Sequence, residues 1–150
     1  MTPQVIARLN DMVQADIPLA RAAGIRLARG NDDTIVAHAP LAANGNPHGS
    51  AFGGSLYVTA LVAGYAQTVL LVEQANVDAS VVVSQAQAEY HQPLHADISA
   101  SVAPIDAKTR TRFIKTLSRH GRGRLELTAR VIDARIPVFD LHVRFAAIAP

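Results

Sequence analysis

The residues best suited to chemistry lie in a short stretch that runs from Asn46 to the glycine pair Gly53 and Gly54. The side-chain amide of Asn46 could orient a water molecule or bind a carbonyl oxygen, and His48 could act as a base near neutral pH. The glycines open a long apolar segment. At the N-terminus of a helix, backbone N–H groups lack intrahelical partners and lie at the positive end of the dipole. A carbonyl oxygen could therefore approach the amides of Gly53 and Gly54 closely, as a developing oxyanion requires.

Each of these residues also has a plainer interpretation. The glycines could serve only close packing on a sheet, and Asn46 lies in the sequence NGNP, which is common in turns. A loop histidine such as His48 could simply be solvated. We favour a site role for Asn46 and leave both interpretations of His48 open. Ser55 is expected to hydrogen-bond the backbone rather than to act as a nucleophile, because no histidine–acid relay accompanies it.

The element that must position these residues is the uncharged segment from Ala51 to Val72. At roughly 1.5 Å per residue it is long enough to span a bilayer, so a membrane helix and a helix buried in a soluble domain are both candidates. The strands predicted after it present a large apolar face, and only this segment is long enough to cover that face. We therefore expect a core helix; Gly64 and Gln67 within it also suit packing on a sheet better than contact with lipid.

The rest of the chain predicts short helices followed by a strand-rich region. Residues 2–15 and 18–23 are expected to be helical, and residues 40–49 to form a loop. Alternation of apolar and polar residues predicts strands at 24–29, 34–39, 80–90, 97–103, 109–119, 124–132 and 138–146. Residues 120–123 are expected to be a tight turn between two of these strands. Small residues at 84, 86 and 88 would let the long helix pack closely.

Composition bounds the function. The chain of 150 residues suits one domain, 1–150, in which residues 1–23 form a helical lead-in. It has no cysteine, which favours a reducing cytoplasm, and charged residues near the start argue against a secretory signal. A net charge of +2 and few aromatic residues give little support for nucleic-acid binding. His91 and His95 could suggest a metal pair, but no third ligand accompanies them, so no metal is expected.

Several local motifs resemble those of the acyl-CoA thioesterases of the hotdog fold. NPHGSAFGG at residues 46–54 resembles their Asn-x-x-Gly-x-x-His-Gly-Gly motif, and YHQP at residues 90–93 resembles the aromatic-x-x-Pro that closes their third strand. PLAANGN at 40–46 followed by FGGSLY at 52–57 is similar to thioesterase domains of the YiiD C-terminal type. This resemblance covers about Gly24 to the C-terminus. It implies an α+β hotdog fold, in which a curled antiparallel sheet wraps a long central helix.

The resemblance also implies hydrolysis of acyl-CoA or a related acyl thioester, without a cofactor, at the interface of a homodimer or a dimer of dimers. Asn46, His48 and Gly54 would then be catalytic. The substrate-binding residues would come from the loop and helix and from a strand of the partner subunit: Gly49, Phe52, Gly53, Ser55, Ser84, Gln85 and Glu89.

The chain departs from the family pattern at two positions. Phe52 stands where relatives carry the histidine, and Leu61 stands nine residues later, where many carry a catalytic acid. Glu73 cannot replace that acid, because 21 residues beyond Phe52 it lies roughly 31 Å along the helix axis. Glu89 is the acid to test first, although a solvated strand residue is the expected outcome. The departures raise a second hypothesis, a non-catalytic acyl-thioester binding module, and make a hydratase of the same fold less favoured.

A group of basic residues surrounds Gly121: Arg110, Arg112, Lys115, Arg119, Arg122 and Arg124. They could hold the phosphates of coenzyme A. An ordinary solvated hairpin, protected from edge pairing by its positive charge, is the alternative and is slightly favoured.

Overall fold

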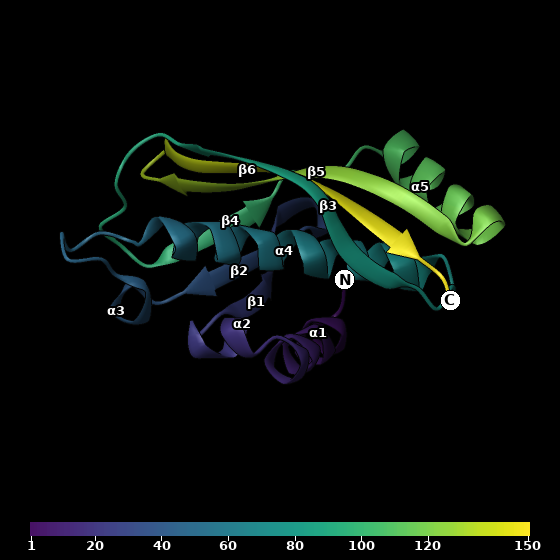
Figure 1. The fold of residues 1–150 in the computed structure, drawn as a ribbon, viewed down its shortest axis with the longest axis horizontal. Coiled ribbons are helices and arrows are strands. Elements are labelled where there is room, and N and C mark those ends of the chain that lie inside the picture. The colour runs from purple at the N-terminus through teal and green to yellow at the C-terminus, as the bar shows by residue number, and fades with distance from the viewer.

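One six-stranded antiparallel sheet, in the order β1-β2-β4-β5-β6-β3, curls around a central helix, α4 (Figure 1). The computed structural model describes all 150 residues. The strands are β1 (Arg26–Arg29), β2 (Ile35–Ala39), β3 (Ser80–Tyr90), β4 (Ile98–Val102), β5 (Arg122–Asp133) and β6 (Ile136–Ile148). The helices are α1 (Pro3–Asp16), α2 (Pro18–Ala22), α3 (Leu41–Asn44), α4 (Gly53–Gln74) and α5 (Ala107–His120).

Helix α4 is the core helix that the sequence predicts. It is the one helix of the chain long and apolar enough to cross a membrane, and most of its apolar length is buried within the protein. Eleven of its residues are buried, among them Leu56, Ala63 and Leu71. The sheet covers it as the alternation of β4, β5 and β6 predicts, because Ala100, Leu125 and Phe145 all point inward and are buried.

The N-terminal helices pack into the same core. Leu9 and Val13 of α1 and Ala20 of α2 are fully buried. The side chain of Asn10 binds both the amide and the carbonyl of Leu27 on β1. The lead-in therefore closes the sheet at its β1 edge.

The predicted strand at residues 109–119 is wrong, because this segment is helix α5. Asp106 caps its N-terminus by accepting a hydrogen bond from the amide of Thr109. Phe113 and Leu117 are four residues apart and are both buried, which is helical spacing. The predicted tight turn at 120–123 is wrong for the same reason: Gly121, at φ 65°, ends α5 in the left-handed conformation, and β5 begins at Arg122.

Two smaller expectations also need correction. The predicted loop at 40–49 contains the short helix α3. Ser84 does not pack against α4, because it lies at a bulge in β3 and is exposed, whereas Ala86 and Ala88 do pack against the core. Helix α4 approaches the sheet closely at Gly64, where an added Cβ would lie 2.9 Å from Leu127 and 3.1 Å from Phe145.

Candidate active site

The first turn of α4 leaves two backbone amides without partners. The capping residue Phe52 makes no side-chain cap hydrogen bond. Its carbonyl accepts from the amides of Ser55 and Leu56, so the helix ladder starts there. The amides of Gly53 and Gly54 take part in no hydrogen bond of the protein. They form a pair of donors at the positive end of a 22-residue helix.

The segment before α4 is fixed to the body of the protein at several points. The buried amide of Asn44 donates to the carbonyls of Ala23 and Pro40, each at 2.8 Å. The carbonyl of Asn44 accepts from the amide of Phe52, and the amide of Ala51 donates to the carbonyl of Leu94, again at 2.8 Å. The start of α4 is therefore held on both sides.

Asn46 closes the turn between these two anchored points. Its Oδ1 accepts from the amides of His48 at 2.9 Å and Ser50 at 3.1 Å, and its Nδ2 donates to Ser50 Oγ at 2.8 Å. Gly49 adopts φ 77°, which this turn needs. In a single protomer, Asn46 thus shapes the turn; the second proton on its Nδ2 is left for a water or a substrate oxygen.

Tyr90 also belongs to the site, although it was not among the site residues predicted from the sequence. It comes from the end of β3, and its hydroxyl donates to the carbonyl of Gly53 at 2.9 Å. Its ring lies over Gly53, 3.1 Å from where a Cβ would be. Burial raises the pKa of Tyr90, and the nearby Tyr57 raises it further, so the hydroxyl remains a donor. The sequence did contain a signal for this residue, because Tyr90 is the aromatic residue of the motif YHQP.

The other predicted loop and helix residues lie around this turn and differ in how exposed they are and in what their side chains contact. His48 is exposed, and its ring makes no hydrogen bond within the protein. Phe52 is 57% exposed, and its ring lies over Gly54. Ser55 is partly exposed in the first turn, and its hydroxyl has no partner, which differs from the backbone bond expected.

The structure does not bring the predicted β3 residues to the glycine amides of the same protomer. Glu89 pairs with Asp140, and Tyr90 with Phe139. Because neighbouring residues in a strand point to opposite faces, Glu89 lies on the outer face of the sheet while Tyr90 lies on the inner face. Ser84 and Gln85 bind Arg144, through its carbonyl and its guanidinium respectively.

Residues that could hold a metal ion occur on the outer face. Ligand atoms of Glu89, His91 and Asp140 lie within 4.8 Å of one another. Asp140 already accepts from His91 at 3.2 Å and contacts Arg130 at 3.3 Å. His95 is elsewhere: its Nδ1 lies 3.2 Å from the carbonyl of Gly49, next to the Asn46 turn. A carbonyl can only accept, so Nδ1 is the donor in this contact, and Nε2 makes no hydrogen bond within the protein.

No carboxylate of the helix is near the free amides. Leu61 is partly buried against the core. Glu73 lies near the far end of α4, where it forms a two-pronged ion pair with Arg8 at 2.6 Å. Within one protomer, the first turn of α4 therefore offers amide donors but no acid from the helix, and the imidazole of His95 contacts the preceding turn.

Comparisons with known proteins agree with this architecture. A family model described as "Putative thioesterase (yiiD_Cterm)" matches residues 6–149. A protein of unknown function from Chlorobaculum tepidum is 26% identical, with a TM-score of 0.91 over 98% of this chain and 96% of that one. A putative thioesterase from Shewanella oneidensis is 20% identical, with a TM-score of 0.87 over 98% and 99%.

A thioesterase from Haemophilus influenzae is a more distant neighbour. It is 17% identical, with a TM-score of 0.70 over 96% of this chain and 90% of that one. The structural neighbours confirm the predicted hotdog fold, a curled antiparallel sheet around a long helix.

Proposed function

We propose that this chain, which belongs to the family of putative thioesterases of the YiiD C-terminal type, hydrolyses acyl-CoA or a related acyl thioester. The observation that carries the proposal is the pair of free amides of Gly53 and Gly54, at the N-terminal end of α4 and directly after an anchored turn. Donors of this kind, fixed before the reaction, stabilise the charge that develops on a carbonyl oxygen during acyl transfer.

In the proposed reaction the thioester carbonyl oxygen accepts from the two glycine amides. A water molecule attacks the carbonyl carbon and gives up a proton to a base, and a tetrahedral intermediate forms. The C–S bond then breaks, the thiolate leaves, and it takes up a proton. The products are a carboxylic acid and a free thiol, and no cofactor enters the balance.

The base in this proposal is an imidazole at the turn. His48 is the residue expected from the sequence, and His95 is the second candidate because Gly49 fixes its orientation through Nδ1. Asn46, through its remaining amide proton, would orient the water or the carbonyl. Gly49, Phe52 and Ser55 would line the acyl thioester.

A homodimer fits the sheet. Strand β3 stands at one end of the strand order, so one edge of its 11 residues is unpaired. Val82 and Val83 on this strand are 47% and 43% exposed, and an unpaired edge with exposed apolar side chains is a surface that another strand can cover. In such a dimer Ser84, Gln85 and Glu89 would approach the site of the neighbouring protomer, and Glu89 is the carboxylate to test. A cytoplasmic location fits the lack of cysteine.

The direct test is a panel of acyl-CoA substrates of different chain length, assayed for free thiol at high enzyme concentration. Thiol release that depends on enzyme concentration is the expected result. Absence of thiol release across the whole panel would contradict the proposal.

The second candidate function is a non-catalytic module that binds acyl thioesters. The observation that favours it is the lack of a helix carboxylate, because Leu61 and Phe52 replace the polar pair of relatives. Calorimetry separates the two: tight binding of acyl-CoA without turnover would support the module. Turnover that Asn46→Ala abolishes would exclude it.

A further inference from the structure

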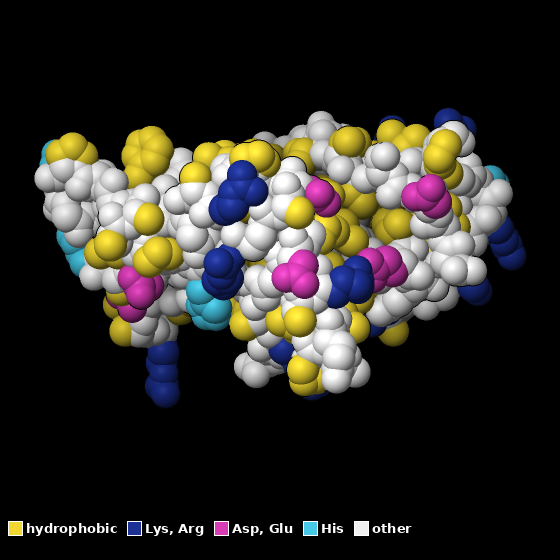
Figure 2. Space-filling model, turned by 90° about the horizontal axis from the view of Figure 1, so that it is seen from below, with side chains coloured by type: hydrophobic (Ala, Val, Ile, Leu, Met, Phe, Trp, Pro, Cys, Tyr) yellow, Lys and Arg dark blue, Asp and Glu magenta, His cyan; other side chains and the backbone are white.

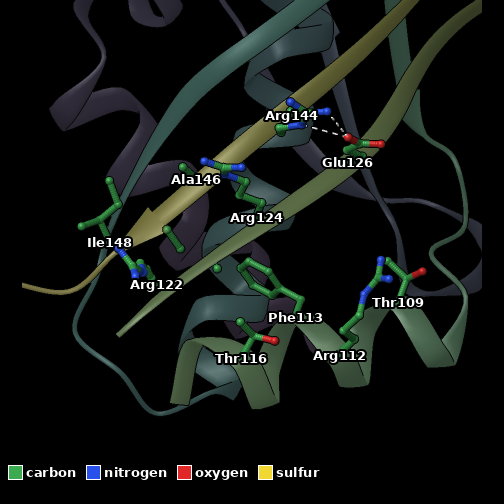
Figure 3. A pocket seen from close by; sticks show the side chains of 12 residues that line it. Thr109, Arg112, Phe113, Thr116, Arg122, Arg124, Glu126, Arg144, Ala146 and Ile148 are labelled. Atoms are coloured by element: carbon green, nitrogen blue, oxygen red, sulfur yellow. Dashed lines mark hydrogen bonds and ion pairs between the residues drawn. The ribbon is translucent and has the colours of Figure 1, made fainter. Parts of the chain in front are cut away.

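A large cavity lies at the opposite end of α4 from the glycine amides. It has a volume of about 1030 Å³ and lies between α5 and the neighbouring ends of β5 and β6 (Figure 3). Helix α5 meets the end of α4 there, where Ser118 Oγ donates to the carbonyl of Ala75 at 3.1 Å. The 22 residues of α4 place this end roughly 33 Å from the first turn. The cavity is therefore separate from the candidate active site of the same protomer.

Arginines dominate the lining of the cavity. Arg122 and Arg124 project from β5, Arg144 from β6 and Arg112 from α5 (Figure 3). Only Arg144 is neutralised, by Glu126 at 2.6 Å. Arg112, Arg122 and Arg124 have no carboxylate partner. Three guanidinium groups without a carboxylate partner make the lining electropositive, which favours an anionic ligand.

The surrounding sequence strengthens this charge. Between Asp106 and Glu126 the chain has no acidic residue, and Asp106 is already used to cap α5. A groove on α5 beside the cavity adds Lys108 and Lys115. By contrast, the face seen from below, where α1 and α2 lie, shows acidic and basic side chains interspersed (Figure 2). The lining of the cavity differs from that face in having three arginines without a carboxylate partner.

The lining of the cavity also has an apolar part, which an inorganic anion would not contact. Ala146 and Ile148 of β6 and Phe113 of α5 form apolar parts of its lining. Thr109 and Thr116 also line the cavity and contribute hydroxyl groups. Its volume is at the upper end of the range found for pockets that hold small organic ligands, about 300–1,000 Å³. The combination suits a phosphorylated organic molecule.

We propose that this cavity binds a nucleotide through its diphosphate. Arginines of the lining bind the phosphate oxygens, since guanidinium groups bind phosphates in a two-pronged manner: Arg122 and Arg124 lie on the β5 side of the cavity and Arg112 on the α5 side (Figure 3). The organic part of the ligand lies over Ala146 and Ile148. The ligand is either a free nucleotide or the nucleotide part of coenzyme A. Binding of coenzyme A rests on the proposed function. It also requires the cavity of one protomer to serve the active site of another, because the two sites of one protomer are separated by the length of α4.

Calorimetric titration with ADP tests the binding without any need for hydrolysis. We expect saturable binding at one site per chain, weakened at high salt. The double variant Arg112→Gln/Arg124→Gln should bind ADP at least 10-fold more weakly, with an unchanged melting temperature. The matched control is Arg26→Gln, an exposed arginine on β1 without an ion pair, which should bind as the native protein does. Lack of saturable ADP binding, or equal binding by the double variant, would overturn the proposal.

A pair of substrates distinguishes the two sources. Acyl-CoA carries the nucleotide, whereas an acyl-N-acetylcysteamine thioester lacks it. If coenzyme A is the source, the double variant raises KM for acyl-CoA relative to KM for the short analogue. If a free nucleotide is the source, the ratio of the two KM values is unchanged while ADP binding is lost. Because ADP binding is measured on its own, a protein without thioesterase activity would still give a clear answer.

Discussion

Asn46 is the residue on which the geometry of the candidate site depends most. Three hydrogen bonds from its side chain close the turn over Ser50, and the turn leads directly into the first residues of α4. A change at Asn46 therefore moves the groups around the glycine amides even if Asn46 never touches a substrate.

Asn46→Ala is expected to lower kcat/KM about 10- to 100-fold, because small displacements of positioned groups are that costly. Asn46→Asp is the matched control: it keeps the oxygen that accepts from the amides of His48 and Ser50, but loses both donors of Nδ2, the one to Ser50 Oγ and the one left for a water or a substrate oxygen. It should therefore retain more activity than the alanine variant. Steady-state kinetics on one acyl-CoA checks this, and equal losses in both variants would show that the turn is not what Asn46 contributes.

Tyr90 gives a prediction for alkaline pH. Burial, and then Tyr57, raises the pKa of Tyr90 above its ordinary value of 10.0, so the folded state holds this proton more tightly than the unfolded state. The resulting stability is fully present below pH 10 and is lost as pH rises through the raised pKa. Tyr90→Phe removes this pH-dependent contribution to the free energy of unfolding, because phenylalanine does not titrate. Urea denaturation at a series of pH values should show a shallower loss of stability above pH 10 in the variant; parallel curves would contradict the account.

Part of the site could be predicted from residue types alone. Asn46, His48 and the glycine pair stand out because few other residues can supply amides, an imidazole and unobstructed backbone N–H groups. The sequence could not show that the Asn46 oxygen is already used by two amides, because this depends on the turn conformation. The position of Glu89 was predictable in principle: it neighbours Tyr90, so the two must point to opposite faces of the strand.

At the scale of elements, the contact between α4 and the sheet depends on Gly64. A Cβ there would lie 2.9 Å from Leu127 Cδ1. Gly64→Val is expected to destabilise the protein by about 1–3 kcal/mol through overpacking, which lowers Tm by roughly 2–12 °C for a chain of this length. Gly64→Ala is the control, since the end of the Leu127 side chain can move and alanine favours the helix. Equal Tm values for the two variants would contradict this packing.

Helix α5 shows why an element can be misread from its sequence. Phe113, Ile114 and Leu117 follow helical spacing, and Asp106 and Gly121 stand at the positions of an N-cap and a C-terminal glycine. The prediction of a strand placed Phe113 and Leu117 on one face and Ile114 on the other, and residues four apart share a face in a strand as well as in a helix. The long helix and the strands with strict alternation were predicted correctly because their apolar patterns extend over many residues.

At the scale of the whole molecule, the unpaired edge of β3 predicts a dimer. Val83→Asp places a charge on this edge and should shift the protein towards monomer. The control is Ile136→Asp at the start of β6, since Ile136 is 52% exposed, comparable with Val83 at 43%, and lies away from that edge. Light scattering after size-exclusion chromatography measures the mass. A native protein that is monomeric, or a dimer that survives Val83→Asp unchanged, would count against the arrangement.

The central claim is that the free amides at the start of α4 stabilise the oxyanion, and Gly53 allows a direct test. Gly53→Pro removes one N–H group; proline suits the first position of a helix, and the preceding Phe52 is already extended at φ −63° and ψ 135°. Gly53→Ala is the control: it places a Cβ against the ring of Tyr90, as the proline variant does, but keeps the N–H group.

The decisive measurement is kcat for one acyl-CoA in these two variants, with Tm measured in parallel. We predict that Gly53→Pro is about 100- to 1,000-fold slower than Gly53→Ala, the usual cost of losing one oxyanion donor, at a similar Tm. Equal kcat values in two folded variants would contradict the account.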